Sequence, residues 1–429
     1  MTNFHSTNYK LQCVATSRIF NDEGWMVDDP QCASPSLIRA IYEKKQLSFD
    51  NDDLGIYKFA DWLPVSHTLN GSSAPVTYKS EGLAKKLNLS NLFITISGYM
   101  PERGANFSTC SFKETEAYSV CGRIDPANKQ ILVVASAGNT ARAFAKVCSD
   151  NNIKLLLCVP EDNIDALWFN EPLNDCVKLI VSEKGADYFD AIHLGNIAVE
   201  SPMFYAEGGA KNIARRDGMG TTYLSAATFI GSLPDYYFQA IGSGTGAIAA
   251  WEANMRMIAD GRFGNTKTKL ILSQNAPFLV MYNAWEKKSR ALLPLSDNDA
   301  RKAVEEIDAK VLSNRKPPYS ITGGVFDALT YSEGDIKKIS NSDSAAAAKL
   351  FEQTEGIDIH PAAAVAVASL IEAVEKGEID RDKTIMINIT GAGSERYARE
   401  HKLIYLKPSA VFPMNPDKDS VIKTIEKLY

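Results

Sequence analysis

One lysine and three glycine-bearing stretches contain residue types suited to chemistry on a phosphorylated ligand. Lys113 stands in "CSFKETEAY" (110–118), and the glycines fall in "SAGNT" (136–140), "GSGTG" (242–246) and "TGAGS" (390–394). A lysine amine can act as a nucleophile or as a base. A glycine-rich turn that leads into a helix offers backbone N–H groups to an anion. The four stretches together indicate a site for a phosphate-bearing cofactor.

Each feature alone also has an ordinary structural explanation. Lys113 could be a solvated lysine with a local ion pair, and a single glycine loop could be only a tight turn. "GSGTG" matches neither the dinucleotide pattern G-x-G-x-x-G nor the P-loop, and no lysine follows it to hold a nucleotide γ-phosphate. The order of the three loops after one candidate lysine favours the cofactor site.

The elements that must position these residues alternate between apolar runs and amphipathic segments. Strands are predicted within 131–136, 153–160, 177–182, 235–244, 268–273 and 384–391. A helix is predicted from 139, because one apolar face is formed by Ala141, Phe144, Ala145 and Cys148. Continuous apolar strands separated by helices predict an α/β fold with parallel sheets, in which ligands bind beyond the carboxyl ends of the strands.

Composition argues against several other classes of protein. The 429 residues suit two domains, and the net charge of −6 does not favour nucleic acid as a partner. No apolar run is long enough to cross a membrane, and the first residues lack the profile of a signal peptide, so we expect a cytoplasmic protein. The seven cysteines include no C-x-x-C pair and the five histidines are scattered, so neither disulfides nor a metal site are expected.

These motifs resemble those of the pyridoxal-phosphate enzymes with the tryptophan synthase β fold (fold type II), and in particular the threonine synthase branch. "SFKETEA" resembles the lysine motif S-F-K-D-R-G, and "ASAGNTARAFA" the S-x-G-N-T loop. "GSGTG" resembles the cofactor-phosphate loop and "ITGAGS" the segment at the pyridine nitrogen. The resemblance covers nearly the whole chain. It implies pyridoxal 5′-phosphate, bound between two open twisted α/β domains.

The resemblance also implies a division of the chain and a role for each motif. It implies an N-terminal extension (1–65), a larger cofactor-binding domain (66–125 with 228–429) and a smaller substrate-side domain (126–227). Lys113 would bear the cofactor and act as the catalytic base. The other cofactor contacts would come from Asn139, Gly242, Ser243, Gly244, Thr245, Gly246 and Thr390.

The sequence departs from threonine synthases at three places. Of the paired cysteines of their zinc ribbon only Cys13 and Cys32 remain, so the ribbon-like extension would be degenerate and free of metal. Glu114 stands where the lysine motif has aspartate. His360 stands where threonine synthases have an acidic residue, and a hydrogen-bonded or surface histidine is the favoured interpretation there.

These departures resemble a diverged threonine synthase paralogue that would use sulfite to replace the phosphate of O-phospho-L-serine. The product would be L-cysteate, for coenzyme M biosynthesis, and the family resemblance implies a homodimer. The alternatives are threonine synthase acting on O-phosphohomoserine and a phosphoserine-dependent sulfhydrylase. A non-catalytic protein that binds a phosphorylated ligand is the alternative from another class. The expected partners are small-molecule substrates, with neither nucleic acid nor membrane.

The substrate would meet side chains on both sides of the lysine. By resemblance to the substrate-phosphate site of threonine synthases, the candidates are Ser111, Ser136, Thr140, Asn212 and one of Arg215 or Arg216. Arg142 is a further candidate, although a solvated helix surface is the favoured interpretation for it. The α-carboxylate would meet backbone N–H groups around Ala137 and Gly138, where the predicted helix begins.

Overall fold

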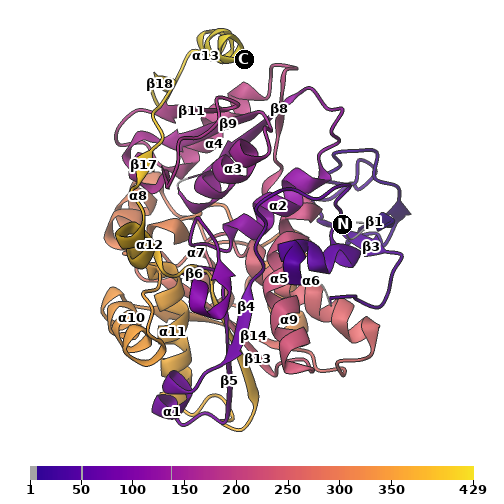
Figure 1. Cartoon of the computed structure of the whole chain (residues 1–429), viewed down its shortest axis with the longest axis vertical. Helices are drawn as coiled ribbons and strands as arrows, with labels where there is room; N and C mark the ends of the chain where they lie inside the picture. The colour runs from indigo at the N-terminus through magenta and orange to yellow at the C-terminus, as the bar shows by residue number, and fades with distance from the viewer. Residues whose placement is uncertain (1–6, 50–51, 137) are drawn as a thin grey trace.

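Two parallel sheets dominate the computed structural model, which describes residues 7–49, 52–136 and 138–429 (Figure 1). The larger sheet has the order β15-β14-β13-β16-β5-β4, and its neighbouring strands are parallel except for β4 and β5. Its strands are β4 (Val76–Lys79), β5 (Asn91–Ile96), β13 (Tyr236–Ala240), β14 (Lys269–Asn275), β15 (Asp335–Ile339) and β16 (Thr384–Ile389).

The smaller sheet is parallel throughout and has the order β12-β8-β9-β11-β18. Its strands are β8 (Ile131–Ala135), β9 (Leu155–Pro160), β11 (Val177–Ser182), β12 (Phe204–Ala206) and β18 (Ala410–Phe412). Strand β18 therefore brings the end of the chain back to the smaller sheet, next to β11. The domain boundaries inferred from the sequence stay a prediction.

Helices cover both sheets. Those nearest the smaller sheet are α3 (Asn139–Asp150), α4 (Tyr188–Ala198) and α13 (Lys418–Ile425). The others are α1 (Gly82–Leu87), α2 (Lys113–Arg123), α5 (Ile213–Ile230), α6 (Thr245–Asp260), α7 (Val280–Glu286), α8 (Asp297–Glu306), α9 (Val325–Ser332), α10 (Asn341–Glu355), α11 (Pro361–Glu375) and α12 (Ser394–Glu400). Short 3-10 helices are η1 (Asp52–Trp62), η2 (Pro101–Arg103), η3 (Glu161–Ala166), η4 (Gly209–Lys211), η5 (Lys310–Leu312) and η6 (Glu426–Leu428).

The predicted α/β fold is confirmed in its individual elements. Each of the six predicted apolar runs overlaps a strand, namely β8, β9, β11, β13, β14 and β16. The predicted helix after β8 is α3, and the four side chains of its apolar face are fully buried. Burial of both sheet faces explains why these strands are continuous apolar runs.

The N-terminal extension contains a small antiparallel sheet, which packs on α5 and α6 of the larger unit, the part of the chain built around the larger sheet. Its order is β2-β1-β3, with β1 (Tyr9–Cys13), β2 (Ile19–Phe20) and β3 (Ile38–Tyr42). The Tyr42 hydroxyl donates to Asp217 of α5 at 2.5 Å, and Arg39 Nε donates to Glu252 of α6 at 3.0 Å. Across the described ranges, no three His, Cys, Asp or Glu side chains are grouped so that they could hold a metal ion.

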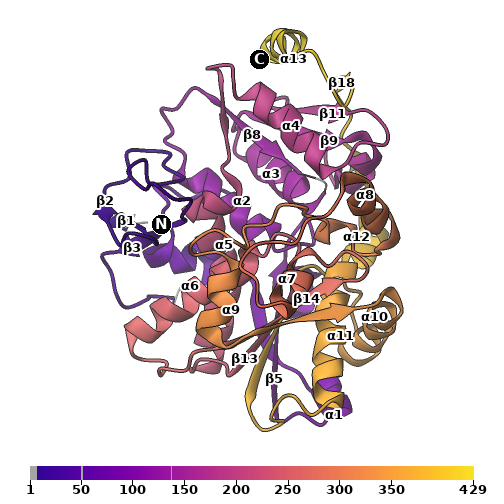
Figure 2. The same ribbon diagram turned by 180° about the vertical axis from the view of Figure 1, so that it is seen from behind.

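Two further strand pairs and a long connection complete the fold. Strand β6 (Tyr99–Met100) pairs with β7 (Ala105–Asn106), and β10 (Trp168–Phe169) pairs with β17 (Ile404–Tyr405). Figure 2 shows α8 and the chain after it passing between the two sheets. Arg301 of α8 lies 3.3 Å from Asp190 of α4, so this connection contacts the smaller unit. None of the helices in the described part of the chain has the length and apolarity that a membrane crossing requires.

Candidate active site

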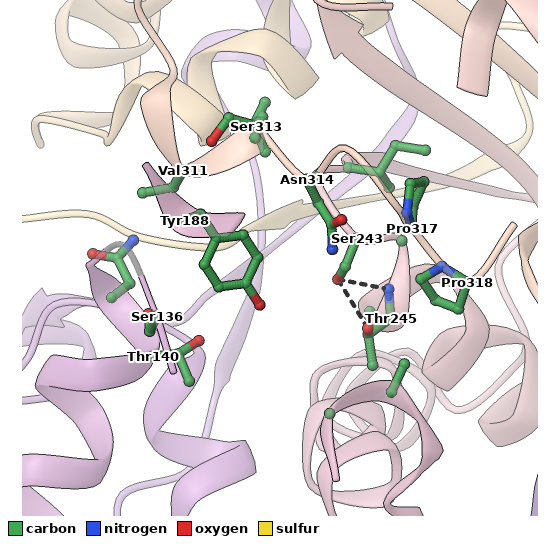
Figure 3. A pocket seen from close by; sticks show the side chains of 18 of the residues that line it. Ser136, Thr140, Tyr188, Ser243, Thr245, Val311, Ser313, Asn314, Pro317 and Pro318 are labelled. Carbon is green, nitrogen blue, oxygen red and sulfur yellow. Dashed lines mark hydrogen bonds between the residues drawn. The ribbon is translucent and has the colours of Figure 1, made fainter. Parts of the chain in front are cut away.

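A cavity of about 550 Å³ lies between the two sheets, at the carboxyl ends of β8, β13 and β16. All three predicted glycine loops contribute to its wall, as does Lys113. Figure 3 shows Ser136, Thr140 and Tyr188 on one side of it, and Ser243 and Thr245 on the other. The sheet topology explains this meeting, because parallel strands end at a common edge.

The loop before α6 has the properties of a phosphate cradle. Gly244 has φ +77°, and a Cβ atom there would collide with Val325, whereas a Cβ atom on Gly246 would lie 2.6 Å from Gln239 Nε2. Glycine therefore keeps the turn tight and its backbone open to the cavity. Helix α6 begins at Thr245, so its first N–H groups have no partner within the helix and face an anion favourably. These residues fit the phosphate of the implied cofactor.

Lys113 is the first residue of α2 and lies on the cavity wall. The chain before it is fixed to the turn after β16, because Phe112 N donates to Thr390 O at 3.0 Å and the Ser111 hydroxyl donates to the same atom at 3.4 Å. Burial lowers the pKa of the Lys113 amine, although Glu116 opposes this effect. A larger fraction of the amine is therefore unprotonated near neutral pH, as a nucleophile or base requires.

Glu116 connects Lys113 to the opposite wall, a role that sequence reasoning missed. Its buried carboxylate accepts hydrogen bonds from Lys113 Nζ at 3.2 Å and from Thr140 Oγ1 at 2.9 Å. Arg215 Nη1 lies 3.5 Å from the same group, and Arg215 Nε also donates to Glu207 at 2.8 Å. The sequence signal was the spacing of three residues from Lys113 to Glu116, one helical turn.

Thr390 and His360 form the far end of the cavity wall. His360 N donates to Gly391 O at 3.0 Å, and the imidazole lies so near Gly391 that a side chain there would have no room. Burial, with Arg142 nearby, lowers the pKa of His360 to about 3. The ring is therefore neutral at neutral pH, beside the turn proposed to face the pyridine nitrogen.

The loop between β8 and α3 supplies the wall opposite α6. Ser136, Gly138, Asn139 and Thr140 line the cavity. The Ser136 hydroxyl accepts from Gly138 N at 3.2 Å, and Asn139 Oδ1 accepts from Arg142 Nη2 at 2.9 Å. Ala137 lies outside the described residues.

Four of the predicted substrate residues do not belong to the cavity wall as the described chain forms it. Asn212 caps α5 by accepting from Ala214 N at 3.0 Å, and Arg216 Nε donates to Glu252 at 2.9 Å. Arg142 donates to Thr109 O at 2.9 Å, and Ser111 donates to Thr390 O. Each of these polar groups is buried and already has a partner, so the packing does not favour its substrate role.

Other features also differ from what sequence alone suggested. Glu114 is not on the cavity wall as the described chain forms it, and it accepts from Thr109 N at 2.5 Å. Tyr188, at the start of α4, and the segment 311–318 line the cavity, and no motif marked them. Figure 3 shows Asn314, Pro317 and Pro318 of this segment beside Ser243.

Comparison with known proteins identifies the family of this chain. Residues 79–391 match the family described as pyridoxal-phosphate dependent enzyme. A cysteate synthase from Methanosarcina barkeri is 46% identical over 96% of this chain and 98% of that protein. A cysteate synthase from Methanocella arvoryzae is 46% identical over 97% of this chain and 99% of that protein.

A solved structure shares the fold at low sequence identity. The structure of maize serine racemase superposes with a TM-score of 0.56 and 13% identity, over 74% of this chain and 87% of that one. This likeness concerns the fold, whereas the family rests on sequence identity over nearly the whole chain. The chain therefore belongs to the pyridoxal-phosphate dependent enzymes and, among them, to the family of the cysteate synthases.

Proposed function

We propose that this enzyme replaces the phosphate of O-phospho-L-serine by sulfite, giving L-cysteate and inorganic phosphate. The observation that carries the proposal is the 46% identity to cysteate synthases over nearly the full length of both chains. In the reaction, the bond from the β-carbon to the phosphate oxygen breaks, and the sulfite sulfur forms the new bond to that carbon. The α-proton is removed and later returned, so the atoms balance without an oxidant.

The cofactor would be held by residues of both walls. Pyridoxal phosphate, when bound, withdraws electrons from the substrate α-carbon and so eases loss of the α-proton. The N–H groups at the start of α6 would bind its phosphate, and Asn139 and Thr390 would orient its ring. Lys113 would hold the cofactor and, once the substrate replaces it, would take the α-proton at Nζ and return it.

The substrate anions would meet the loop before α3. We propose that Ser136, Gly138 and Thr140 contact the substrate, because all three residues line the cavity. The Gly138 N–H and the Thr140 hydroxyl already donate to Ser136 and Glu116, so the Ser136 hydroxyl would donate to the substrate anion. Arg215 also lines the cavity, but two carboxylates already engage its guanidinium. Lys211 and Lys316 are further cations at the wall. Such cations stabilise both the departing phosphate and the entering sulfite.

Product analysis tests this function. The purified enzyme with pyridoxal phosphate is given phosphoserine plus sulfite, phosphoserine plus sulfide, or phosphohomoserine in water. We expect cysteate and phosphate in equal amounts from the first mixture. Threonine from the third mixture, or cysteine from the second, without cysteate from the first would overturn the proposal. The chain belongs to an enzyme family, so the non-catalytic alternative is not favoured.

The role in coenzyme M biosynthesis, the homodimer and the cytoplasmic location are part of the same proposal. Each rests on the family resemblance or on composition. Sedimentation of the purified chain tests the dimer, for which we expect twice the chain mass of 47.0 kDa. A monomer at working concentrations would exclude it.

A further inference from the structure

A cluster of four charged side chains spans the cavity wall and the protein interior directly behind it. Lys113 of α2 and Arg215 of α5 are its cations, and Glu116 of α2 and Glu207 after β12 are its anions. The Glu116 side chain is fully buried, and the side chains of Glu207 and Arg215 are 5% and 12% exposed. The formal charges cancel, which is how a protein tolerates four charges in so little water.

Glu116 is the centre of this cluster. One of its oxygens accepts from Lys113 Nζ, and the other accepts from Thr140 Oγ1 and lies 3.5 Å from Arg215 Nη1. All three partners line the cavity, whereas Glu116 stands behind them. A single carboxylate therefore sets where three cavity groups from three helices point.

Lys113 is the member of this cluster whose amine would be bonded to the cofactor at one stage and free at another, and Glu116 is placed to hold it when it is free. Arg215 has a second carboxylate partner in Glu207, and Thr140 is held at the start of α3. Lys113 has no other carboxylate at ion-pair distance among the described residues. When the amine is not bonded to the cofactor, Glu116 is the group that can hold it close to the cavity, within reach of a substrate α-carbon.

We propose that Glu116 is a positioning residue, whose carboxylate holds the Lys113 amine at the cavity wall whenever that amine is free and favours its protonated form. This inference rests on the proposed attachment of the cofactor to Lys113. It deepens that proposal by naming Glu116 as the group that holds the protonated Lys113 amine in place until the proton is returned.

The charges that face Lys113 predict the direction of the effect. Burial lowers the pKa of the amine and Arg215 acts in the same direction, whereas Glu116 and Glu207 raise it. Tyr188 of α4 also faces the cluster, but burial raises its pKa, so it is neutral at neutral pH. Removing the Glu116 charge therefore removes the nearest group that raises the pKa of Lys113.

The experiment measures cofactor attachment to the full-length chain from which cofactor has been removed. Pyridoxal phosphate is added at a series of pH values, the reaction is quenched with borohydride, and the labelled peptide is quantified by mass spectrometry. The attachment rate rises with pH as the amine loses its proton. In Glu116→Gln we expect the midpoint of this rise to shift to lower pH by about one unit. The titration of the cofactor's own groups is the same for all variants, so it does not affect the difference between their midpoints.

Glu114→Gln is the matched control. Glu114 is on the same helix and is equally buried, but it accepts from Thr109 N and has no contact with the Lys113 amine. We expect its midpoint to equal that of the wild type. An unshifted midpoint in Glu116→Gln, or an equal shift in both variants, would overturn the inference.

Glu116→Asp keeps the test decisive where Glu116→Gln does not fold. It retains the charge but places it one methylene further from the amine, so its midpoint should lie between those of the wild type and Glu116→Gln. A midpoint equal to that of the wild type would count against Glu116. Label on a lysine other than Lys113 would instead overturn the proposed attachment site, so the two failures are distinguishable.

Discussion

The hydrogen-bond and ion-pair partners of a buried side chain determine whether it is available to the substrate. Three arginines near the cavity illustrate this point. Arg142 donates to backbone carbonyls and to Asn139, and Arg216 donates to Glu252, whereas of these three only Arg215 lines the cavity. Arg215 and Arg216 are adjacent in the sequence, so residue type and position alone do not indicate which one meets the cavity.

The role of Lys113 leads to the first prediction. Lys113→Ala should abolish the visible absorbance of bound cofactor and lower turnover by roughly 10²–10⁴-fold, because the tether and the base are lost together. Spectroscopy and product assays on the purified variant measure both quantities. Lys146→Ala is the control, since Lys146 pairs with Asp150 at 2.7 Å and does not line the cavity. Full absorbance in Lys113→Ala would remove this lysine from the site.

Glu114 predicts a dependence of stability on pH. Burial raises its pKa from 4.5 to about 7. Between these values the folded protein binds a proton that the unfolded chain releases, so this contribution to stability is lost as pH rises. In Glu114→Gln the loss is absent, so the free energy of unfolding relative to wild type should rise by about 3 kcal/mol from pH 4 to pH 8. Urea denaturation at both pH values measures the difference, and a pH-independent difference would contradict it.

Residue types and spacing predicted that the lysine and the three loops meet at one cavity, because loops after parallel strands lie at a common edge of the sheet. They could not predict which polar side chains face the cavity. Asn212 and Arg216 follow the expected pattern but serve as a helix cap and a buried ion-pair partner. Conversely, no motif marked Glu116, although its carboxylate accepts from Lys113 and Thr140. The direction of a side chain depends on packing between distant helices, which no short motif encodes.

At the scale of elements, the junction of β13 and α6 is where we propose that the cofactor phosphate binds. Strand β13 and the first residues of α6 are separated by four residues, 241–244, so the strand end fixes where the helix dipole points. Apolar periodicity predicted both kinds of element, because burial of a sheet face dictates it. The connection 307–324, however, has little regular structure, and its course over the cavity was not predictable.

This junction gives a prediction with an internal control. Gly244→Ala should weaken cofactor binding about tenfold, because alanine is strained at φ +77° and would collide with Val325. Gly261→Ala, at the other end of α6, has the similar φ of +83° but open space around it. It should lower stability without changing cofactor affinity. Equal affinities of the two variants for pyridoxal phosphate in an equilibrium titration would contradict the role of the loop.

At the scale of the whole molecule, charged pairs join the two units across the cavity. Arg315, on the connection after α8, forms an ion pair with Asp187, which caps α4. Arg301 of α8 reaches Asp190 on the same helix. The cavity is therefore bounded by a contact between two units that have separate sheets, and the geometry of the site depends on how these units are held together.

Breaking this contact should affect substrate binding more than the chemical step. Arg315→Met should raise the KM for phosphoserine roughly fivefold, which corresponds to about 1 kcal/mol, with a smaller change in kcat. Arg290→Met is the control, because Arg290 pairs with Asp327 within the larger unit. Steady-state kinetics of both variants give KM and kcat, and equal KM values would show that the contact does not shape the site.

The return of the chain to the smaller sheet at β18 has a consequence for synthesis on the ribosome. Strand β11 leaves the ribosome more than 200 residues before β18, its edge partner. Until β18 emerges, the nascent smaller sheet exposes the unpaired apolar edge of β11, which is open to aggregation or to chaperones. The smaller sheet is therefore completed by a strand that is made only after every described residue lining the cavity.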